Sequence, residues 1–436
     1  MSSNRSQKAE KPRPLEYESG RVKDKLGVVI GAGSTGIISA TIMAERCNLI
    51  QIFESTEKIG GVTRDLQGPG NRIFYAGCQY LRPNDFPEDY DMSDLVTFEH
   101  RYGSVTEVEG NFVFKNNFAG PAFPDSYFEF DQSIQSDALE IGTKSLRDRL
   151  SLYSGPIKSH LLAFAIRVLH KDHLDAFPAY SSTALSLSRV TTLGREIDLI
   201  LQKNLCSVSD ELYGVPRSTL GLEFEAAAIP KFGYSKFWNN VIEQLNQRSR
   251  VELQLKSKVN QAWSLGDPRI SSASEKVWTG DPRFPVRYFT GSKLESISHK
   301  KYVTGFFIEA FEGPCLPYYL NVFSAGGSLT RIYIYQLGDE LRISLESLTP
   351  FSDIESLKNE LAPIFEAANI RARLPKQDLT SLLSRQYFPF SFGDASLLVE
   401  TELKMGENGW RESGLPHWDR ASRIRKIKKS FGLNDY

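Results

Sequence analysis

One glycine-rich turn constrains the fold of this 436-residue chain more than any other feature. The run GAGSTG (31–36) stands directly between the apolar segment KLGVVI (25–30) and the segment IISATIMAERC (37–47), whose apolar residues recur at helical spacing. A second apolar segment, NLIQIFE (48–54), follows. We therefore expect a strand, a tight turn, a helix and a second, parallel strand, joined as one right-handed βαβ unit.

The turn itself has the spacing of a phosphate-binding loop, because Gly31, Gly33 and Gly36 fit the pattern G-x-G-x-x-G. The first glycine permits the tight turn, the second lets backbone amides approach a pyrophosphate, and the third lets the helix pack closely on the strand. The helix N-terminus at Ser34 and Thr35 would add N–H donors and about half a positive charge. The sequence thus predicts a dinucleotide site.

An acid and a glycine pair complete this site. Glu54 ends the second strand about 20 residues after the turn, where a carboxylate can accept hydrogen bonds from both ribose hydroxyls and would repel a 2′-phosphate. NAD and FAD enzymes share this arrangement, so the acid leaves both open. Gly60 and Gly61 favour FAD, because a second glycine pair lets the backbone pass close to the ribityl and flavin end of the longer cofactor. We count Ser55 and Val62 with these candidate cofactor contacts.

The run GAGSTG followed by ESTEKIGG resembles the FAD-binding fingerprint of the amine-oxidase-like and UDP-galactopyranose mutase-like flavoproteins, over residues 27–64. The later run AIPKFGYSKFWNNVIEQL, followed by RVELQLKSKV, is similar to that superfamily's proline-glycine turn, helix and strand. The resemblance implies that Val259, the last valine of this strand, lies beside the adenine end of FAD. It also implies the fold class: α/β, with a Rossmann-like FAD-binding domain of the GR2 type, a helical insertion and a second, antiparallel-sheet substrate domain.

Periodicity along the rest of the chain suggests the domain boundaries. SHLLAFAIRVLHKDHL and GREIDLILQKNL have helical periodicity, whereas KYVTGFFIEAF, YYLNVFSAG, LTRIYIYQL and ELRISLESL alternate as antiparallel strands do. We expect a flexible tail over 1–24, a discontinuous FAD-binding domain over 25–85, 220–265 and 380–436, a mainly helical substrate or cap domain over 86–219, and an antiparallel-sheet substrate domain over 266–379.

Within the superfamily, the order of segments resembles the mutase branch. That branch carries a glycine- and histidine-rich loop against the flavin, and the equivalent run RIFYAGCQYLRP keeps Gly77 but has no histidine, which leaves the reaction open. The branch also places a substrate arginine on a later strand beside aromatic residues. The run LTRIYIY offers Arg331 with Tyr333 and Tyr335 on one face of a strand, and we take these three as candidate catalytic residues. Such an arginine suits a diphosphate; an edge-strand arginine packed by two tyrosines is the alternative.

The superfamily's late FAD motif is less distinct. Either YFPFSFGDASLL or MGENGWRESGLPHWDR can take its place, and we favour the second because its glycines precede the basic run RASRIRKIKK. We interpret that basic run as a solvated helix face rather than a nucleic-acid site, since the net charge is −1 and no basic excess surrounds it.

Three functional hypotheses follow. The first is an FAD-dependent enzyme acting on a nucleotide-linked or activated sugar, by mutase-like reduced-flavin chemistry, in cell-surface glycan synthesis. The second is an FAD oxidoreductase of the amine-oxidase or protoporphyrinogen-oxidase type. The third is a non-catalytic protein with the FAD fold.

Other features set expectations about partners and location. The two histidines of the run HKDH are not accompanied by a carboxylate-rich motif, so we expect no metal site there. No apolar run approaches the roughly 18 residues of a membrane span, and the four scattered cysteines suit a reducing cytoplasm. The expected partner is a small molecule, and a homodimer stays open.

Overall fold

The structure, a computed structural model, describes residues 25–68, 71–77, 79–98, 101–128, 144–194, 196–205, 207–219, 227–260, 265–295, 299–374, 380–386, 390–417 and 419–433. The tail expected over 1–24 lies outside these residues, as does the start of the segment YFPFSFGDASLL.

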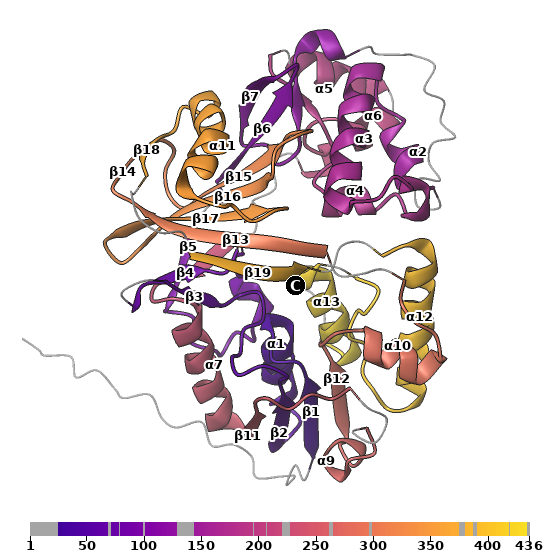
Figure 1. Ribbon diagram of the computed structural model, residues 1–436. Helices are drawn as coiled ribbons and strands as arrows, with labels where there is room; N and C mark the ends of the chain where they lie inside the picture. Colours follow the sequence, from indigo (N-terminus) through magenta and orange to yellow (C-terminus); the bar gives the residue numbers. More distant parts are fainter. Residues whose placement is uncertain are drawn as a thin grey trace, which may run out of the picture.

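The glycine turn follows one strand of a four-stranded parallel sheet (Figure 1). Its order is β11-β2-β1-β12, and the register places Gly27 of the first strand between Ile50 and Glu275. The predicted βαβ unit is confirmed by the parallel pairing of β1 with β2. The bounds are β1 (Leu26–Ile30), β2 (Leu49–Phe53), β11 (Arg250–Gln254) and β12 (Glu275–Trp278).

Helix α1 (Ser34–Met43) fills the space beside this sheet. All ten of its residues are buried, as expected for a helix whose small and apolar side chains cover every side. It packs against two further helices, α7 (Tyr234–Arg248) and α13 (Arg420–Ser430). Ile424 and Ile427 of α13 join this core, whereas the basic residues of the helix are partly or fully exposed, as expected for a helix with one solvated face.

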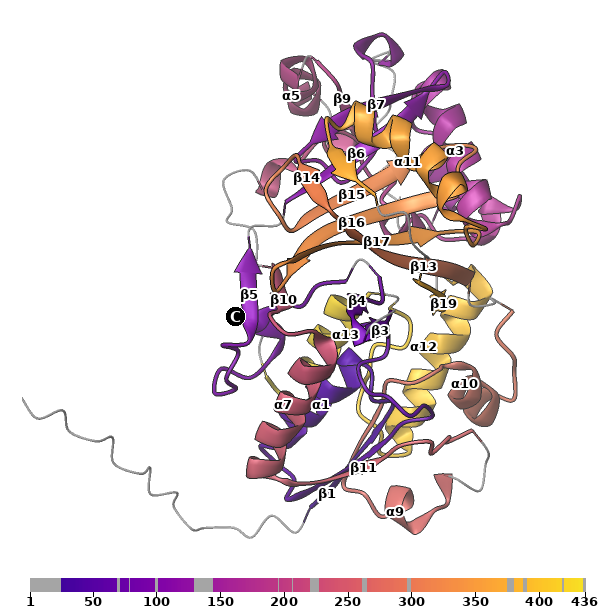
Figure 2. The same ribbon diagram turned by 60° about the vertical axis from the view of Figure 1, so that its left-hand side comes forward.

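A seven-stranded sheet lies across the carboxyl-end side of the parallel sheet (Figures 1 and 2). Its order is β19-β13-β17-β16-β15-β6-β7, and every pair is antiparallel except β15 with β6. The bounds are β6 (Tyr102–Val108), β7 (Asn111–Asn116), β13 (His299–Ile308), β15 (Tyr318–Phe323), β16 (Leu329–Leu337), β17 (Glu340–Ser347) and β19 (Thr380–Gln386).

The two faces of this sheet belong to different cores, because side chains alternate along each strand. On β16, Ile332 and Ile334 pack with α11 (Ile354–Ala367), whereas Tyr333 and Tyr335 join the core around α1. The antiparallel strands that we predicted therefore contribute to two cores, one shared with α11 and the other shared with α1.

A helical region with its own core lies beside one end of this sheet (Figure 1). Ser145 begins it with a capping box, in which its side chain accepts from the N–H of Asp148 and the Asp148 side chain accepts from the N–H of Ser145. The elements are β8 (Ala122–Phe123), α2 (Leu146–Leu150), α3 (Gly155–Leu169), α4 (Ser181–Ala184), β9 (Thr191–Thr192), α5 (Glu196–Leu205) and α6 (Ser207–Leu212).

The remaining elements connect these bodies. Helix α10 packs against α12, and both share a core with Val28 and Ile30 of β1, on the face of the parallel sheet that α1 does not cover. The bounds are β3 (Asp65–Gln67), β4 (Ile73–Tyr75), β5 (Leu95–Phe98), β10 (Ala227–Pro230), α9 (Pro268–Ser271), α10 (Arg283–Thr290), β14 (Ala310–Glu312), β18 (Arg371–Arg373) and α12 (Phe392–Glu407). No helix in these described ranges has the length and hydropathy of a membrane span.

Four strands lie outside the boundaries that we expected. β12 pairs with β1 and so belongs to the parallel sheet, although we placed 266–379 in the antiparallel domain. β6 and β7 extend the seven-stranded sheet, although we placed 86–219 in the helical domain, and β19 joins the same sheet rather than the FAD-binding domain. These are pairings between segments far apart in the chain, which local periodicity does not encode.

Candidate functional site

The glycine turn has the close packing that its spacing predicts. Gly31 has φ +100°, a left-handed conformation that a side chain would strain, and its N–H donates to the carbonyl of Phe53 at 2.8 Å. A Cβ atom on Gly36 would lie 1.8 Å from the carbonyl oxygen of Gly31. The turn therefore requires glycine at both positions.

The N-terminus of α1 carries no side-chain cap. Gly33 is the N-cap residue in extended conformation, and having no side chain it leaves the helix uncapped. The first-turn N–H groups of Ser34, Thr35 and Gly36 have no partner within the helix, as in any α-helix. These groups and the helix dipole form a site suited to an anion such as a pyrophosphate.

Glu54 is buried next to this turn, with 8% exposure. Its Oε2 accepts a hydrogen bond from the N–H of Ala32 at 2.8 Å, and its Oε1 accepts from the N–H of Thr56 at 2.8 Å and from the Ser55 hydroxyl at 3.2 Å. A carboxylate oxygen has two lone pairs, so acceptor capacity remains for a ribose hydroxyl. The acid thus also holds the protein's own backbone, a role that the sequence did not suggest.

Gly60 and Gly61 pack against the glycine turn itself. The N–H of Gly60 donates to the carbonyl of Ala32 at 2.8 Å, and the two glycines have φ of +96° and +60°. A Cβ on Gly60 would lie 2.5 Å from the carbonyl oxygen of Thr63, and one on Gly61 would lie 3.0 Å from the Cα of Gly33. The pair is needed for this backbone contact, whatever lies beyond it, and the neighbouring Val62 is 42% exposed.

Val259 follows β11 rather than ending it. The strand stops at Gln254, because the chain then turns over the end of β2: Lys256 has φ +55° and its N–H donates to Thr56, and the N–H of Ser257 donates to the carbonyl of Glu54. The expected strand over 251–259 is therefore too long by several residues. The turn nevertheless places Val259 in the lining of the same cavity as Gly31 and Ser55.

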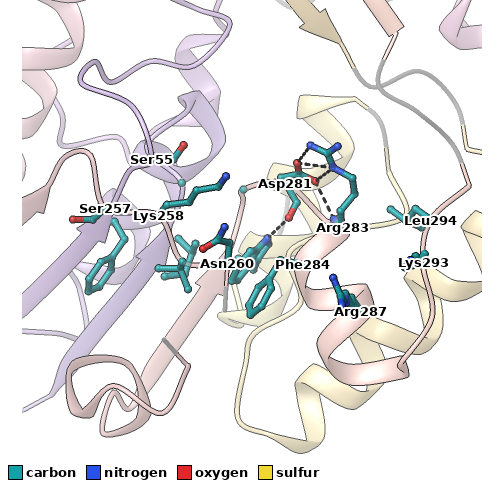
Figure 3. A pocket seen from close by; sticks show the side chains of 16 residues that line it. Ser55, Ser257, Lys258, Asn260, Asp281, Arg283, Phe284, Arg287, Lys293 and Leu294 are labelled. Atoms are coloured by element: carbon teal, nitrogen blue, oxygen red, sulfur yellow. Dashed lines mark hydrogen bonds and ion pairs between the residues drawn. The ribbon is translucent and has the colours of Figure 1, made fainter. Parts of the chain in front are cut away.

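A cavity of about 470 Å³ lies at this point, and it is lined by Gly31, Ser55 and Val259 among others. Figure 3 shows Lys258 and Asn260 on one side of it, with Phe284 and Arg287 on the other. Its volume falls within the range of small-molecule sites, roughly 300–1,000 Å³. Three segments that the sequence assigned to cofactor binding thus meet at one cavity.

The far wall of this cavity was missed by the sequence analysis. It is formed by Trp278 at the end of β12 and by the turn and helix that follow. Asp281 organises the turn by accepting from the N–H and the guanidinium of Arg283 at 2.8–3.0 Å, and its carbonyl accepts from the Trp278 indole at 3.2 Å. The run EKVWTGDPRF holds the signal, a short apolar strand followed by glycine, aspartate and proline.

A larger cavity, of about 1050 Å³, lies between residues 82–92 and α13. None of the predicted cofactor contacts lines it. The smaller cavity is the better candidate for a cofactor, because it borders the glycine turn and the chain around Glu54.

Gly77 and Arg331 lie next to the same carboxylate, that of Glu346. Gly77 has φ +129°, and a Cβ there would lie 3.1 Å from Oε1 of Glu346 on β17. The Nη1 of Arg331 lies 3.6 Å from Oε2 of the same carboxylate, and its guanidinium lies 6.0 Å from the ring centroid of Tyr319. The candidate arginine is therefore next to the loop that the resemblance places against a flavin.

The two tyrosines lie deeper than the arginine. Tyr333 stacks on Tyr335 with ring centroids 5.0 Å apart. The hydroxyl of Tyr335 accepts from the N–H of Tyr75 at 2.8 Å and bonds with the Ser344 hydroxyl at 3.1 Å, and burial raises its pKa well above the usual value. Tyr335 is fully buried and supports the β4 backbone, so a catalytic role is not favoured by its position.

The described part of the segment MGENGWRESGLPHWDR, which we favoured as the late FAD motif, lies against β12. Arg411 forms a two-pronged ion pair with Glu275 at 2.6 and 3.0 Å, and Glu402 accepts from the N–H groups of Ser413 and Gly414 at 2.8 and 2.7 Å. The guanidinium of Arg423 donates hydrogen bonds to the carbonyls of Ser413 and Trp278. Burial lowers the pKa of this guanidinium to about 10. The segment thus joins the parallel sheet to α13.

No family model matches the chain, and no curated protein matches it in sequence. Solved structures share its fold. Reduced UDP-galactopyranose mutase has a TM-score of 0.59 at 12% identity, over 94% of this chain and 96% of the mutase. A protein from Exiguobacterium sp. 255-15, provisionally assigned as a protoporphyrinogen oxidase, has a TM-score of 0.52 at 13% identity, over 93% and 98%.

Putrescine oxidase bound to putrescine has a TM-score of 0.51 at 14% identity, over 94% of this chain and 98% of the oxidase. The resemblance to the mutase-like and amine-oxidase-like flavoproteins is therefore confirmed at the level of the fold, along nearly the whole chain. The fold is mixed α/β with a four-stranded parallel sheet.

Proposed function

We propose that this chain binds FAD and is an FAD-dependent enzyme. The observation that carries the proposal is the convergence of the glycine turn, Glu54 and a 470 Å³ cavity at the carboxyl ends of β1 and β2. In open α/β sheets, ligands bind outside the carboxyl ends of the strands. The shared fold with UDP-galactopyranose mutase and putrescine oxidase supports the same reading.

The residues present fit an extended dinucleotide. The N–H groups of the first turn of α1 would bind the pyrophosphate, Glu54 would accept from the ribose, and the backbone around Val259 would border the adenine. Gly33 and Gly61 pack directly against each other, so the glycine turn and the second glycine pair would border the cofactor as one backbone surface. Gly77 would lie towards the flavin ring.

Bound FAD would supply the redox-active ring, whereas the protein would supply orientation and charge. We propose that the substrate is a small molecule beside Arg331, with Tyr333 as an aromatic neighbour. Arg331 has 24% of its side chain exposed, enough to be reached, and its planar guanidinium suits a diphosphate. This supports a nucleotide-linked or activated sugar and a mutase-like reaction.

A second candidate is oxidation of an amine, and the fold shared with putrescine oxidase favours it. The position of Arg331 disfavours it, because an ammonium substrate would meet a guanidinium rather than a carboxylate.

The first test is the flavin content of the purified protein. We expect a yellow protein with flavin absorbance, or an apoprotein that takes up added FAD with a measurable affinity. A folded, colourless protein that takes up no FAD would contradict the proposal and leave the non-catalytic hypothesis.

The second test separates the reactions. We expect interconversion of the pyranose and furanose forms of a nucleotide sugar only after reduction with dithionite. Consumption of putrescine with reduction of oxygen, and no isomerisation, would instead support the amine-oxidase alternative.

A further inference from the structure

Three neighbouring strands bring together a buried cluster of charges that we name the Glu346 cluster: Lys301 on β13, Arg331 on β16 and Glu346 on β17. Oε2 of Glu346 lies 3.4 Å from Nζ of Lys301 and 3.6 Å from Nη1 of Arg331. Arg331 stands directly opposite Glu346 in the register of β16 and β17. One carboxylate therefore orients two cations.

Two of the three charges are removed from water, and Arg331 forms the partly exposed side of the cluster. Glu346 has 0% exposure and Lys301 has 3%. Taking a carboxylate and an ammonium out of water costs several kcal/mol per ion unless opposite charges and hydrogen bonds compensate. A buried ionic group at this cost, beside the loop at Gly77, needs an explanation beyond stability.

Both cations line a small hollow, of about 20 Å³, between the sheet and the helical region. Helix α3 contributes Phe164 and Val168 to it, and the end of α4 contributes Ala184. The described lining combines apolar side chains, neutral polar ones and two cations, with no acid among them. One water molecule needs about 10–15 Å³ by this measure, so the hollow has room for the oxygen atoms of an anionic group and not for a whole substrate.

We propose that Glu346 is a positioning residue that holds Lys301 and Arg331 as a receptor for one anionic group of the substrate. The shared chemistry is a carboxylate or a phosphate whose oxygen atoms enter the hollow, attached to a larger body that stays outside it. The paired ammonium and guanidinium supply charge-assisted hydrogen bonds to such a group. The inference deepens the proposed function, on which it rests for placing the cofactor beside Gly77.

The receptor also selects against amines. A cationic substrate in the hollow would meet two cations and one carboxylate, a net positive charge, in a medium of low dielectric constant, where repulsion is stronger than in water. The cluster therefore distinguishes the anionic substrate class from the amine class on the basis of named side chains.

Calorimetric titration at fixed ionic strength tests the receptor, with four probes: inorganic diphosphate, hexanoate, putrescine and uridine diphosphate. We expect hexanoate or the diphosphates to bind and putrescine not to bind. The hexanoate and diphosphate arms separate a carboxylate substrate from a phosphorylated one. Binding of putrescine alone, or of no anion to the folded protein, would overturn the proposal.

Variants test the individual roles. Arg331→Met and Lys301→Met should each weaken anion binding about tenfold or more, as expected for a lost charged hydrogen bond. The matched control is Arg371→Met, which removes an exposed arginine paired with Glu312 at 3.5 Å, and it should leave anion binding unchanged.

Glu346→Gln gives the decisive result, because it removes a negative charge. If the carboxylate acts only through its charge, anion binding should become tighter; if it positions the two cations, binding should weaken. Tighter or equal binding would overturn the positioning role. Should this variant fail to fold by circular dichroism, Glu346→Asp replaces it: the charge stays, the carboxylate is drawn back from both cations, and binding should still weaken about tenfold.

Flavin absorbance of the same samples separates this inference from the proposed function. A protein that lacks flavin but binds the anion would refute the cofactor assignment and keep the receptor. A flavin-containing protein that binds no anion would do the reverse.

Discussion

The carboxylate of Glu54 accepts a hydrogen bond of 2.8 Å from the backbone N–H of Ala32, inside the glycine turn. The same acid that is expected to bind a ribose therefore fixes the turn that is expected to bind the pyrophosphate. The two halves of the candidate site are coupled through one side chain, and this changes what its substitution should do.

Glu54→Ala should lower both flavin retention and stability. A hydrogen bond to a charged group contributes about 1.5–3 kcal/mol, and the buried N–H of Ala32 would lose its acceptor. The measurements are the FAD dissociation constant and the urea midpoint of the apoprotein. Glu57→Ala, an exposed acid three residues later, is the control and should change neither. If flavin affinity in Glu54→Ala equalled that of the wild type, the ribose assignment would be wrong.

Gly36→Ala should be severely destabilising. The added Cβ would lie 1.8 Å from the carbonyl oxygen of Gly31 and 2.7 Å from Oγ1 of Thr279, and a backbone atom cannot move aside cheaply. Overpacking of this kind costs about 1–3 kcal/mol and occasionally more, which thermal unfolding would detect.

Gly406→Ala is the matched control, since Gly406 lies in helix α12 with no atom within 4 Å of an added Cβ. That substitution should be neutral or stabilise by about 0.5–1 kcal/mol. Equal melting temperatures for the two variants would contradict the close packing of α1 on β1.

Tyr335→Phe should destabilise the protein without altering flavin content. Removing the hydroxyl leaves the buried N–H of Tyr75 without the acceptor 2.8 Å away, at a cost of about 1–3 kcal/mol. The exposed Tyr288 provides the control, Tyr288→Phe. Loss of turnover with an unchanged melting temperature would instead restore the catalytic role expected for Tyr335.

His160 on α3 should make the protein sensitive to mild acid. Burial lowers its pKa, and the nearby Arg167 adds to this effect while Glu107 opposes it. The unfolded chain therefore binds the proton more tightly than the folded one. The stability contributed by neutral His160 is present above the unfolded pKa of about 6.5 and is lost as the pH falls below it.

Urea unfolding on either side of that pH measures the effect. The wild type should lose more stability on acidification than His160→Gln, whereas His173→Gln, at an exposed position, should behave like the wild type. Parallel losses in all three proteins would exclude His160 as the titrating group.

Local sequence was sufficient for the first βαβ unit. The order of apolar segment, G-x-G-x-x-G and helical periodicity admits one arrangement, because the turn, the helix and both strands are contiguous and right-handed crossover is nearly obligatory. It also pointed to Gly31, Ser55 and Val259, which line one cavity, and to the strands of the later sheet as antiparallel.

The tertiary structure decided which distant segments became neighbours. β12 completes the parallel sheet and its following turn walls the cavity, and Gly60 pairs with the glycine turn, which no local pattern specified. Lys301 and Glu346 meet Arg331 only because the register of three strands aligns them. Sequence periodicity fixes which face a side chain takes, but strand register and cross-chain packing fix its partners, and those depend on contacts between residues far apart in the chain.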